Sequence, residues 1–416
     1  MRRLIQVYDK QVIRNFGAIL ALKFDEAIFI YDRFTDTSNL NEFKDLVARH
    51  SNLNLICLNS NGDLNLSAYH SKEDYYNLNG PDNFLNVKLS LYVERNFLNA
   101  FYLFTTDQKL INVRGCAKLE AESKKISLSV EDIINVTGAK VLKKNHTPPD
   151  INDQAFIRDI KNICQVMMMD FDKWTKFITR IAYIINKNGD KNGFNIAKKD
   201  FNKLDRNIIK SLIHFKIISL NDYYLKFKSS RLMKMFKSSG SWLEYLTYIE
   251  LMESNYFDDV EMSTVIDFDG NLFETVDDRC EIDVICTSGL IPIFISNKIG
   301  KIHQEALYEI KSHSLMFGNQ NGRAIICTGS EFSKERYGLY KKAMELDIYV
   351  IEYQDLINHN IAKIVNDVVH NRYQYRQNNR QKKPPLANVK HYDASKDKSH
   401  FVKKKKGKIR QLLKNK

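Results

Sequence analysis

The sequence predicts an α/β protein with three folded units and a basic tail, at residues 1–142, 150–232, 235–370 and 371–416. A chain of 416 residues exceeds what one hydrophobic core usually holds. Strand-like and helix-like segments alternate in the first and third units, which is typical of sheets covered by helices. The 44% hydrophobic and 27% charged content is that of a soluble globular protein.

The first unit begins with short apolar strands separated by helices. We expect strands at 4–7, 26–31 and 53–58, with helices over 11–22 and around 43–48. This order favours a parallel sheet covered on both faces, and such sheets bind ligands beyond the C-terminal ends of their strands. Later in this unit, Ser129 and Asp132 mark a helix start, and Gly138 marks the helix end.

The second unit is predicted to be helical with a small winged-helix element. A linker at 147–149 (TPP) precedes a helix over 157–185. A helix over 204–215 and strands at 216–220 and 223–227 then follow. Such an element can read DNA or serve only as a spacer, and the sequence leaves both open.

The third unit is predicted to be an α/β/α layer structure with a mixed sheet. A hairpin through the turn at 287–289 (TSG) makes two central strands antiparallel. The expected helices are 241–252, 304–317 and 334–346, and the expected strands are 260–268, 281–286, 290–296, 324–327 and 348–351.

The net charge of +13 is concentrated in the tail. From residue 371 onward there are sixteen Lys and Arg against two Asp, which leaves 47 basic and 48 acidic side chains in residues 1–370. This segment lacks apolar periodicity and is predicted to be disordered. It could be a solubilising extension or a non-specific arm for phosphate backbones.

Cysteine spacing and hydropathy predict a cytoplasmic protein without a membrane partner. The six cysteines form no CxxC pair and have no histidine cluster nearby, so we expect reduced thiols and not a zinc site. No segment reaches the ~20 apolar residues of a membrane span. The first residues lack the cleavage site of a signal peptide.

Polar side chains occupy alternate positions along the predicted hairpin of the third unit. Residues two apart in a strand share a face, so Glu281 lies beside Asp283 and Ser296 beside Lys298. A carboxylate in an otherwise apolar strand is costly to bury unless it holds a positive charge. Mg²⁺ or Mn²⁺ is one such partner, with Lys298 stabilising a phosphate. An Asp283–Lys298 ion pair that only ties the hairpin together is the alternative.

These residues resemble a known family. An aspartate, a hairpin and then an acid two residues before a lysine form the pattern of PD-(D/E)XK nucleases, and the segments 240–244 (GSWLE) and 281–284 (EIDV) resemble one branch of them. That branch is the CRISPR ancillary nuclease family, in which a CARF domain that senses cyclic oligoadenylates precedes the nuclease domain. The resemblance extends over essentially residues 1–370.

The resemblance implies a Rossmann-like CARF domain, a connector and a restriction-endonuclease-like domain. It also implies an endonuclease of CRISPR antiviral defence that uses Mn²⁺ or Mg²⁺ on single-stranded or nicked DNA or RNA. Glu244 and Asp283 would hold the metal, Glu281 would be an extra ligand, and Lys298 would be catalytic. The sequence departs from the pattern at Ser296, where the family has an acid, and this should lower metal affinity.

The resemblance also implies a ligand site in the first unit. Gln11 and Asn15 match the Gln…Asn pattern of the family's first loop, and the second loop corresponds to Asn77, Asn79 and Gly80. Arg33 would supply a positive charge. The implied activator is a cyclic oligoadenylate, with cyclic tetra-adenylate as the first choice. A symmetric ring suits the two-fold axis of a homodimer.

Two other functions remain open at the level of sequence. One is a constitutive restriction or repair nuclease with a vestigial sensor. The other is a catalytically inactive regulator that binds nucleic acid through the winged-helix element and the tail, with Ser296 marking a lost site.

Overall fold

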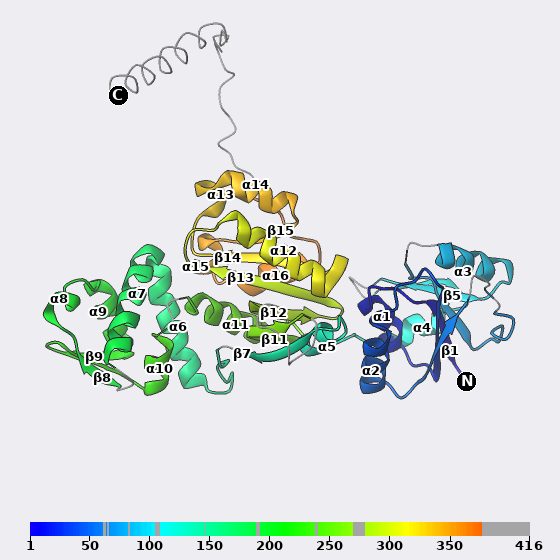
Figure 1. Cartoon of the computed structure of the whole chain (residues 1–416), viewed down its shortest axis with the longest axis horizontal. Coiled ribbons are helices and arrows are strands. Elements are labelled where there is room, and N and C mark those ends of the chain that lie inside the picture. The colour runs from blue at the N-terminus through cyan, green and yellow to red at the C-terminus, as the bar shows by residue number, and fades with distance from the viewer. Residues whose placement is uncertain are drawn as a thin grey trace, which may run out of the picture. The chain divides into compact units, whose positions relative to one another are not determined.

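The computed structural model describes residues 1–60, 64, 66–81, 84–104, 109–144, 146–188, 192–237, 240–268 and 279–376 (Figure 1). The predicted tail from 371 therefore lies almost entirely outside the described residues. No helix in these ranges is long and apolar enough to cross a membrane. All six cysteines are free thiols, and Cys57 and Cys280 are only half-buried.

The N-terminal unit contains a six-stranded sheet of order β3-β2-β1-β4-β5-β6, parallel except for β6. Its buried strands are apolar on both faces, which suits a parallel sheet between helices. One core lies against α1 and α2, and a second lies against α3. The elements are β1 (Arg3–Val7), α1 (Ile13–Ala21), β2 (Glu26–Tyr31), α2 (Leu40–His50), β3 (Asn54–Asn59), β4 (Asp74–Asn77), α3 (Phe84–Arg95), β5 (Asn99–Leu103), β6 (Leu110–Arg114) and α4 (Ala117–Glu122).

The connector contains helices and a three-stranded antiparallel sheet of order β8-β10-β9. The helix expected over 157–185 is interrupted at Asp170, whose extended backbone separates α6 from α7. The elements are α6 (Gln154–Met169), α7 (Phe171–Asn188), β8 (Gly193–Asn195), α8 (Lys198–Phe201), α9 (Arg206–His214), β9 (Ile218–Asn221), β10 (Tyr224–Phe227) and α10 (Ser230–Met235).

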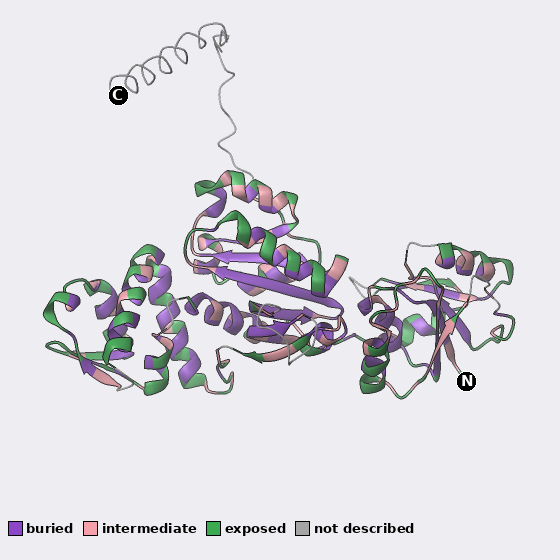
Figure 2. Cartoon of the chain, viewed as in Figure 1, coloured by how far each residue is buried: buried purple, intermediate pink, exposed green. Residues whose placement is uncertain are grey.

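The C-terminal unit contains a mixed six-stranded sheet of order β15-β14-β13-β12-β11-β7. Buried strands lie between exposed helix faces (Figure 2). The elements are α5 (Val130–Asn135), β7 (Lys140–Lys144), α11 (Trp242–Ser254), β11 (Asp259–Asp267), β12 (Arg279–Ser288), β13 (Ile291–Lys298), α12 (Gln304–Gly318), η2 (Asn319–Asn321), β14 (Arg323–Thr328), α13 (Phe332–Glu335), α14 (Tyr337–Glu345), β15 (Ile348–Ile351), α15 (Tyr353–Ile357) and α16 (Ile361–Val369).

The boundaries between the units differ from those expected from the sequence. Strand β7 pairs with β11, so it belongs to the C-terminal sheet although we placed it, up to residue 142, in the first unit. The Val130 amide donates to Asp259 Oδ2 at 2.8 Å, which ties α5 to the same sheet. The connector has no separate core: Trp174 and Phe236 pack on Trp242 of α11, with ring centroids 6.1 and 5.0 Å away.

Candidate active site

The hairpin β12–β13 and the helix α11 position the predicted catalytic residues. Val284 pairs with Ile295, so continuing this register by one residue places Asp283 directly opposite Ser296. The Asn297 amide donates to Asp283 Oδ2 at 2.6 Å, and the Ser296 hydroxyl lies 3.4 Å from the same oxygen. Lys298 Nζ lies 4.0 Å from it. These contacts hold the aspartate at one end of the hairpin.

A small cavity of about 30 Å³ lies over this end of the hairpin, beneath α12. Glu281, Asp283, Ser296 and Lys298 all line it, as the alternation along the two strands predicts. Its size suits a single water or a bare cation.

Glu244 approaches the hairpin from the first turn of α11. The Ser263 hydroxyl donates to Glu244 Oε2 at 2.9 Å. Burial, followed by the negative charge of Asp283, raises the pKa of Glu244 to about 8. The charges of Glu281 and Lys298 also act on this carboxyl, so the four predicted residues share one electrostatic environment.

Burial also raises the pKa of the Asp283 carboxyl, while Lys298 and the Asn297 amide act in the opposite direction. Two partly buried acids near one lysine leave an excess of negative charge that a cation would neutralise. Asp283 Oδ1 and Glu244 Oε1 accept no hydrogen bond among the described residues. This hard-oxygen donor set fits Mg²⁺ or Mn²⁺.

The described residues provide a sparse ligand set for such an ion. Nowhere in the described ranges do three His, Cys, Asp or Glu side chains gather closely enough to hold a metal. Mg²⁺ commonly uses one or two carboxylates and completes its shell with water and phosphate oxygens.

The sequence did not point to three residues that the fold brings to this site. Ser263 has a left-handed φ of 49° and lies in β11 between the paired residues Met262–Val284 and Thr264–Ile282. Glu309 and His313 of α12 line the cavity, and burial lowers the pKa of His313. No spacing rule links them to the hairpin, because strand pairing and helix packing create the contacts.

The residues predicted to bind a ligand lie at the C-terminal edge of the N-terminal sheet. Strand β1 has β2 on one side and β4 on the other. Strands β2 and β3 are therefore added on one side of β1, and β4 and β5 on its other side, which makes β1 the switch point of the sheet. Ligands of α/β sheets bind at such switch points. The predicted set follows three of these neighbouring strands: Gln11 and Asn15 follow β1, Arg33 follows β2, and Asn77, Asn79 and Gly80 end or follow β4.

Several of these side chains are already engaged. Asn15 is fully buried, accepts from the Asp9 amide at 2.8 Å and donates to the Asp9 carbonyl at 2.8 Å. Asn77 donates to Gln6 Oε1 at 2.8 Å, and Asn79 donates to the Leu103 carbonyl at 2.6 Å. They shape the edge in this conformation. Gln11 is different, because its Oε1 is buried without a partner among the described residues.

Among the predicted ligand residues Arg33 is exposed, whereas Gln11 and Gly80 are half-buried. The Arg33 side chain is exposed and lies over the Phe34 ring, 4.7 Å from its centroid. A Cβ at Gly80 would lie 2.6 Å from Asn86 Oδ1, so this backbone packs closely against α3.

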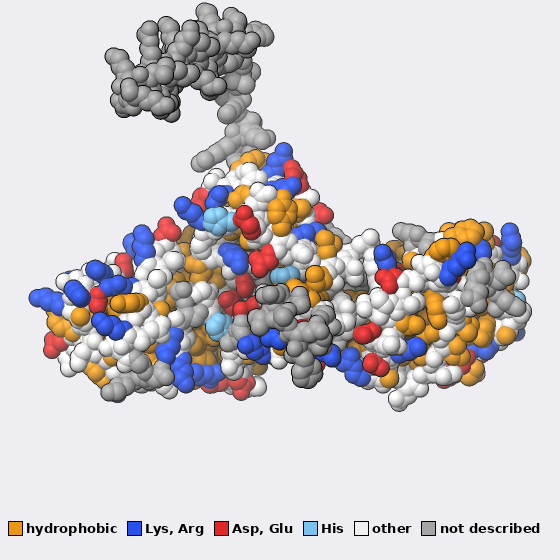
Figure 3. Space-filling model, in the orientation of Figure 1, with side chains coloured by type: hydrophobic (Ala, Val, Ile, Leu, Met, Phe, Trp, Pro, Cys, Tyr) orange, Lys and Arg blue, Asp and Glu red, His pale blue; other side chains and the backbone are white. Residues whose placement is uncertain are grey.

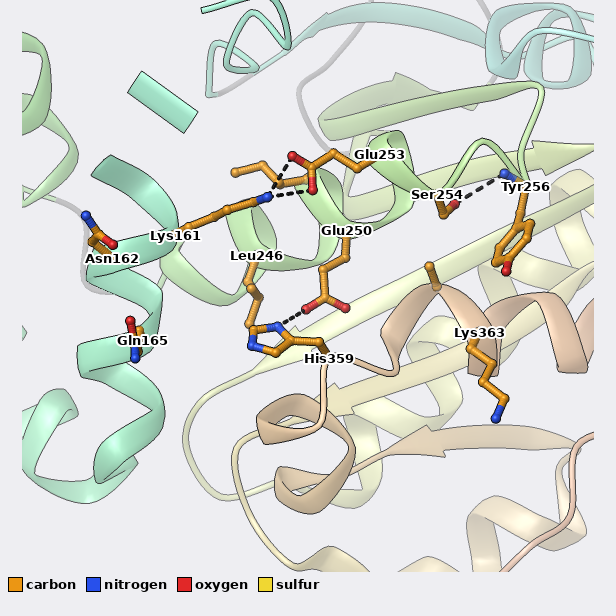
Figure 4. A pocket seen from close by; sticks show the side chains of 12 residues that line it. Lys161, Asn162, Gln165, Leu246, Glu250, Glu253, Ser254, Tyr256, His359 and Lys363 are labelled. Atoms are coloured by element: carbon orange, nitrogen blue, oxygen red, sulfur yellow. Dashed lines mark hydrogen bonds and ion pairs between the residues drawn. The ribbon is translucent and has the colours of Figure 1, made fainter. Parts of the chain in front are cut away.

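A larger hollow of about 590 Å³ lies away from the hairpin, between α6, α11 and α16 (Figure 4). Apart from Lys363, its charged side chains are paired with one another. Lys161 contacts Glu253 at 2.6 Å, and Glu250 accepts from the Ile361 amide and lies 3.0 Å from His359 Nδ1. We therefore assign the chemistry to the smaller cavity over the hairpin.

No protein-family model and no curated protein matches the sequence. Among solved structures, protein VC1899 from Vibrio cholerae aligns with a TM-score of 0.68 and 16% identity, over 89% of this chain and 98% of that chain. Can2 from Sulfobacillus thermosulfidooxidans, in complex with cyclic tetra-adenylate, aligns with a TM-score of 0.59 and 13% identity, over 88% and 97%. The chain has the fold of these two proteins.

This agreement confirms the expected α/β fold class, since both alignments cover nearly the whole of each chain. A type III CRISPR defence DNA nuclease activated by cyclic oligoadenylate also aligns, with a TM-score of 0.42 and 13% identity over 78% of this chain and 45% of that one. That score is too low to assert a common fold.

Proposed function

We propose that the protein is a cyclic-oligoadenylate-activated, metal-dependent endonuclease of CRISPR defence, in the family that joins a CARF sensor to a PD-(D/E)XK nuclease domain. The observation that carries this proposal is the juxtaposition of Glu244, Asp283 and Lys298 at one end of a hairpin, in a chain that shares its fold with a protein bound to cyclic tetra-adenylate. Single-stranded or nicked nucleic acid is the proposed substrate.

In this proposal Asp283 and Glu244 hold Mg²⁺ or Mn²⁺, and Glu281 is an outer acidic residue at the same cavity. The bound ion would activate a water and neutralise charge on the scissile phosphate. Lys298 would place a further positive charge at that phosphate. Its 4.0 Å separation from Asp283 is long for a tight ion pair, which favours a role toward a substrate over a purely structural one.

In the sensor, Gln11 and Arg33 would contact the cyclic oligoadenylate at the switch point. Asn15, Asn77, Asn79 and Gly80 would shape the loops on either side of it. The ligand would act by binding one conformation of the protein better than another.

We also propose a homodimer in which a second copy covers α3. Phe84, Val87 and Leu91 expose 73%, 54% and 51% of their surface and share one face of this helix. Hydrophobic side chains gather there in Figure 3. Helix α3 begins just after the loop that carries Asn79 and Gly80. A second copy at this face would therefore bring two half-sites to one symmetric ring.

Two observations favour the alternative functions. The predicted sensor asparagines are satisfied within the fold, which suits a constitutive nuclease. Ser296 replaces the family acid beside Asp283, which suits an inactive nucleic-acid-binding regulator.

A single experiment separates the three functions. Purified protein is incubated with Mn²⁺, labelled single-stranded RNA and DNA and nicked plasmid, with and without cyclic tetra-adenylate, and with EDTA as the metal-free control. We expect cleavage only with both metal and ligand. Cleavage without the ligand supports a constitutive nuclease. Nucleic-acid binding without cleavage under any condition supports a regulator.

A further inference from the structure

A second hollow lies beside the first turn of α11, next to the candidate active site. Its volume is about 480 Å³. We call it the α11 pocket and define it by His146, Arg231, Lys234, Lys237, Ser241 and Tyr245, all of which line it. None of the described residues that line it is acidic. Because residues 1–370 are nearly neutral, this positive lining is a local feature and not a consequence of overall basicity.

The start of α11 adds a fixed positive end to this pocket. The helix has thirteen residues, and its first amides have no acceptor within the helix. Ser241 precedes the helix without a side-chain cap bond. Free amides together with the helix dipole make such a position favourable for an anion.

An unsatisfied hydroxyl supplies an independent indication of a ligand. Ser241 is 1% exposed, lines the pocket, and its Oγ has no hydrogen-bond partner among the described residues. A buried hydroxyl without a partner costs about 1–3 kcal/mol, and a ligand oxygen or an ordered water in the pocket would remove this cost.

Two cations of the pocket, Arg231 and Lys234, lie on helix α10 of the connector. The Arg231 guanidinium lies over the Phe156 ring, 3.5 Å from its centroid, and 3.2 Å from Asp153. Lys234, on the same helix α10, is exposed and makes no ion pair among the described residues. One cation is therefore fixed and a second is available.

The pocket and Glu244 share one turn of α11. Ser241 and Tyr245 line the pocket, whereas Glu244 between them accepts from the Ser263 hydroxyl of β11. Both the acidic centre and the pocket affect Tyr245. Burial, followed by the charge of Glu244, raises the pKa of Tyr245 to about 12, while Arg231 acts in the opposite direction. An anion bound here would lie beside the acidic centre and not within it.

We propose that the α11 pocket binds a backbone phosphate of the substrate strand adjacent to the scissile phosphate. This inference rests on the nuclease function proposed above and deepens it by assigning a second phosphate subsite. Arg231 and Lys234 would contact the phosphate oxygens, and the Ser241 hydroxyl and the first α11 amides would donate to them.

The test measures binding of a twelve-nucleotide single-stranded DNA to the full chain in EDTA, with cyclic tetra-adenylate present. Each phosphate of the DNA is replaced in turn by a neutral methylphosphonate. For the unaltered protein, we expect one position near the scissile phosphate to weaken binding about 3- to 10-fold. Lys234→Gln should weaken binding of unmodified DNA by a similar factor and should reduce the effect of that one methylphosphonate, because one of its contacts is already lost.

Two further variants distinguish a phosphate subsite from a structural role. Ser241→Ala should weaken binding several-fold, yet leave the thermal midpoint unchanged or higher, because it removes an unsatisfied buried hydroxyl. Lys341→Gln removes an equal charge from the exposed face of α14 and should change neither quantity.

The proposal is overturned if the methylphosphonate effect at that position persists unchanged in Lys234→Gln. Ser241→Ala binding like the unaltered protein with a lowered midpoint overturns it too. Because EDTA prevents metal-dependent cleavage, the result is independent of catalysis. If Lys234→Gln reduces the methylphosphonate effect at one position but the protein does not cleave when Mn²⁺ is restored, the phosphate subsite stands and the nuclease function is contradicted. If the protein cleaves but the methylphosphonate effect does not depend on Lys234, the nuclease function stands and the subsite is contradicted.

Discussion

Three features of Asp283 follow from its neighbours. It is mostly buried, its Oδ2 is held by the Asn297 amide, and its Oδ1 has no hydrogen-bond donor among the described residues. Asp283→Asn keeps the shape and removes the charge. We expect it to lower the cleavage rate at least about 100-fold, measured on labelled oligonucleotide with Mn²⁺. Glu305→Gln, on the exposed first turn of α12, is the control and should cleave normally. Surviving activity in Asp283→Asn would show that the site is misassigned.

Glu244 should make the metal-free protein less stable as the pH rises. Its pKa is raised to about 8 in the folded state, so the folded protein binds this proton more tightly than the unfolded chain does. The stabilising contribution is complete below the ordinary value of 4.5 and is lost as the pH rises through about 8.

The corresponding measurement is urea unfolding in EDTA between pH 4.5 and 8.5. We expect the free energy of unfolding of the unaltered protein to fall by roughly 2–4 kcal/mol relative to Glu244→Gln across this range. The difference between the two proteins isolates this carboxyl from the other titrating groups. A difference that stays constant with pH would contradict the shifted pKa.

Ser263 is held in a backbone conformation that its side chain disfavours. Its φ is 49°, it is fully buried, and its hydroxyl donates to Glu244. Strained residues of this kind concentrate at functional sites. We expect Ser263→Ala to slow cleavage about 10-fold by releasing Glu244.

Comparing Ser263→Gly with Ser263→Ala distinguishes the effect of the backbone conformation from the effect of the hydroxyl. Because glycine adopts positive φ at little cost, this variant should be about 1 kcal/mol more stable than Ser263→Ala in urea unfolding, and equally slow. Unaltered cleavage rates in both variants would remove Ser263 from the site.

At the scale of elements, the exposed apolar face of α3 is the clearest feature without a partner in the described chain. Val87→Asp and Leu91→Asp each place a charge on this face. If a second copy covers it, burial of the charge should shift the protein from dimer to monomer, as measured by light scattering at micromolar concentration. Leu315→Asp changes a comparably exposed residue of α12, at 48%, and should leave the mass unchanged. A monomeric unaltered protein would exclude this interface.

Local sequence gave a good account of most elements and of the hairpin. Alternation predicts that Glu281 shares a face of β12 with Asp283 and that Ser296 shares a face of β13 with Lys298, and all four residues line one cavity. The break between α6 and α7 was missed, because periodicity continues across Asp170 while the backbone turns. Strand β7 was not predicted, and its segment up to residue 142 was placed in the first unit, because its partner β11 lies over a hundred residues away in sequence.

At the scale of the whole molecule, the activator should stabilise the folded protein. A ligand present at a hundred times its Kd adds about 2.7 kcal/mol to the free energy of unfolding. We expect cyclic tetra-adenylate to raise the thermal midpoint of the unaltered protein, measured by calorimetry. Gln11→Ala should reduce this increase without lowering the midpoint of the free protein, because Gln11 Oε1 makes no hydrogen bond among the described residues.

Asn15→Ala should behave differently. Asn15 is fully buried and bonded to both backbone groups of Asp9, so its loss should lower the midpoint of the ligand-free protein. Equal effects of the two variants on the ligand-free protein would contradict this division of roles. Failure of cyclic tetra-adenylate to shift any midpoint would contradict the sensor.

The sequence by itself determined the α/β class, the order of the units and the hairpin that carries Asp283 and Lys298. These depend on periodicity, turn residues and spacing, which are properties of neighbouring residues. The resemblance implied that Glu244 and Asp283 act together, but only the tertiary structure decided that Ser263 bonds to Glu244, that β7 joins the distant sheet, and that the α11 pocket lies beside the acidic centre. These contacts join segments far apart along the chain, and burial, which gives the site its charge properties, exists only once those segments pack together.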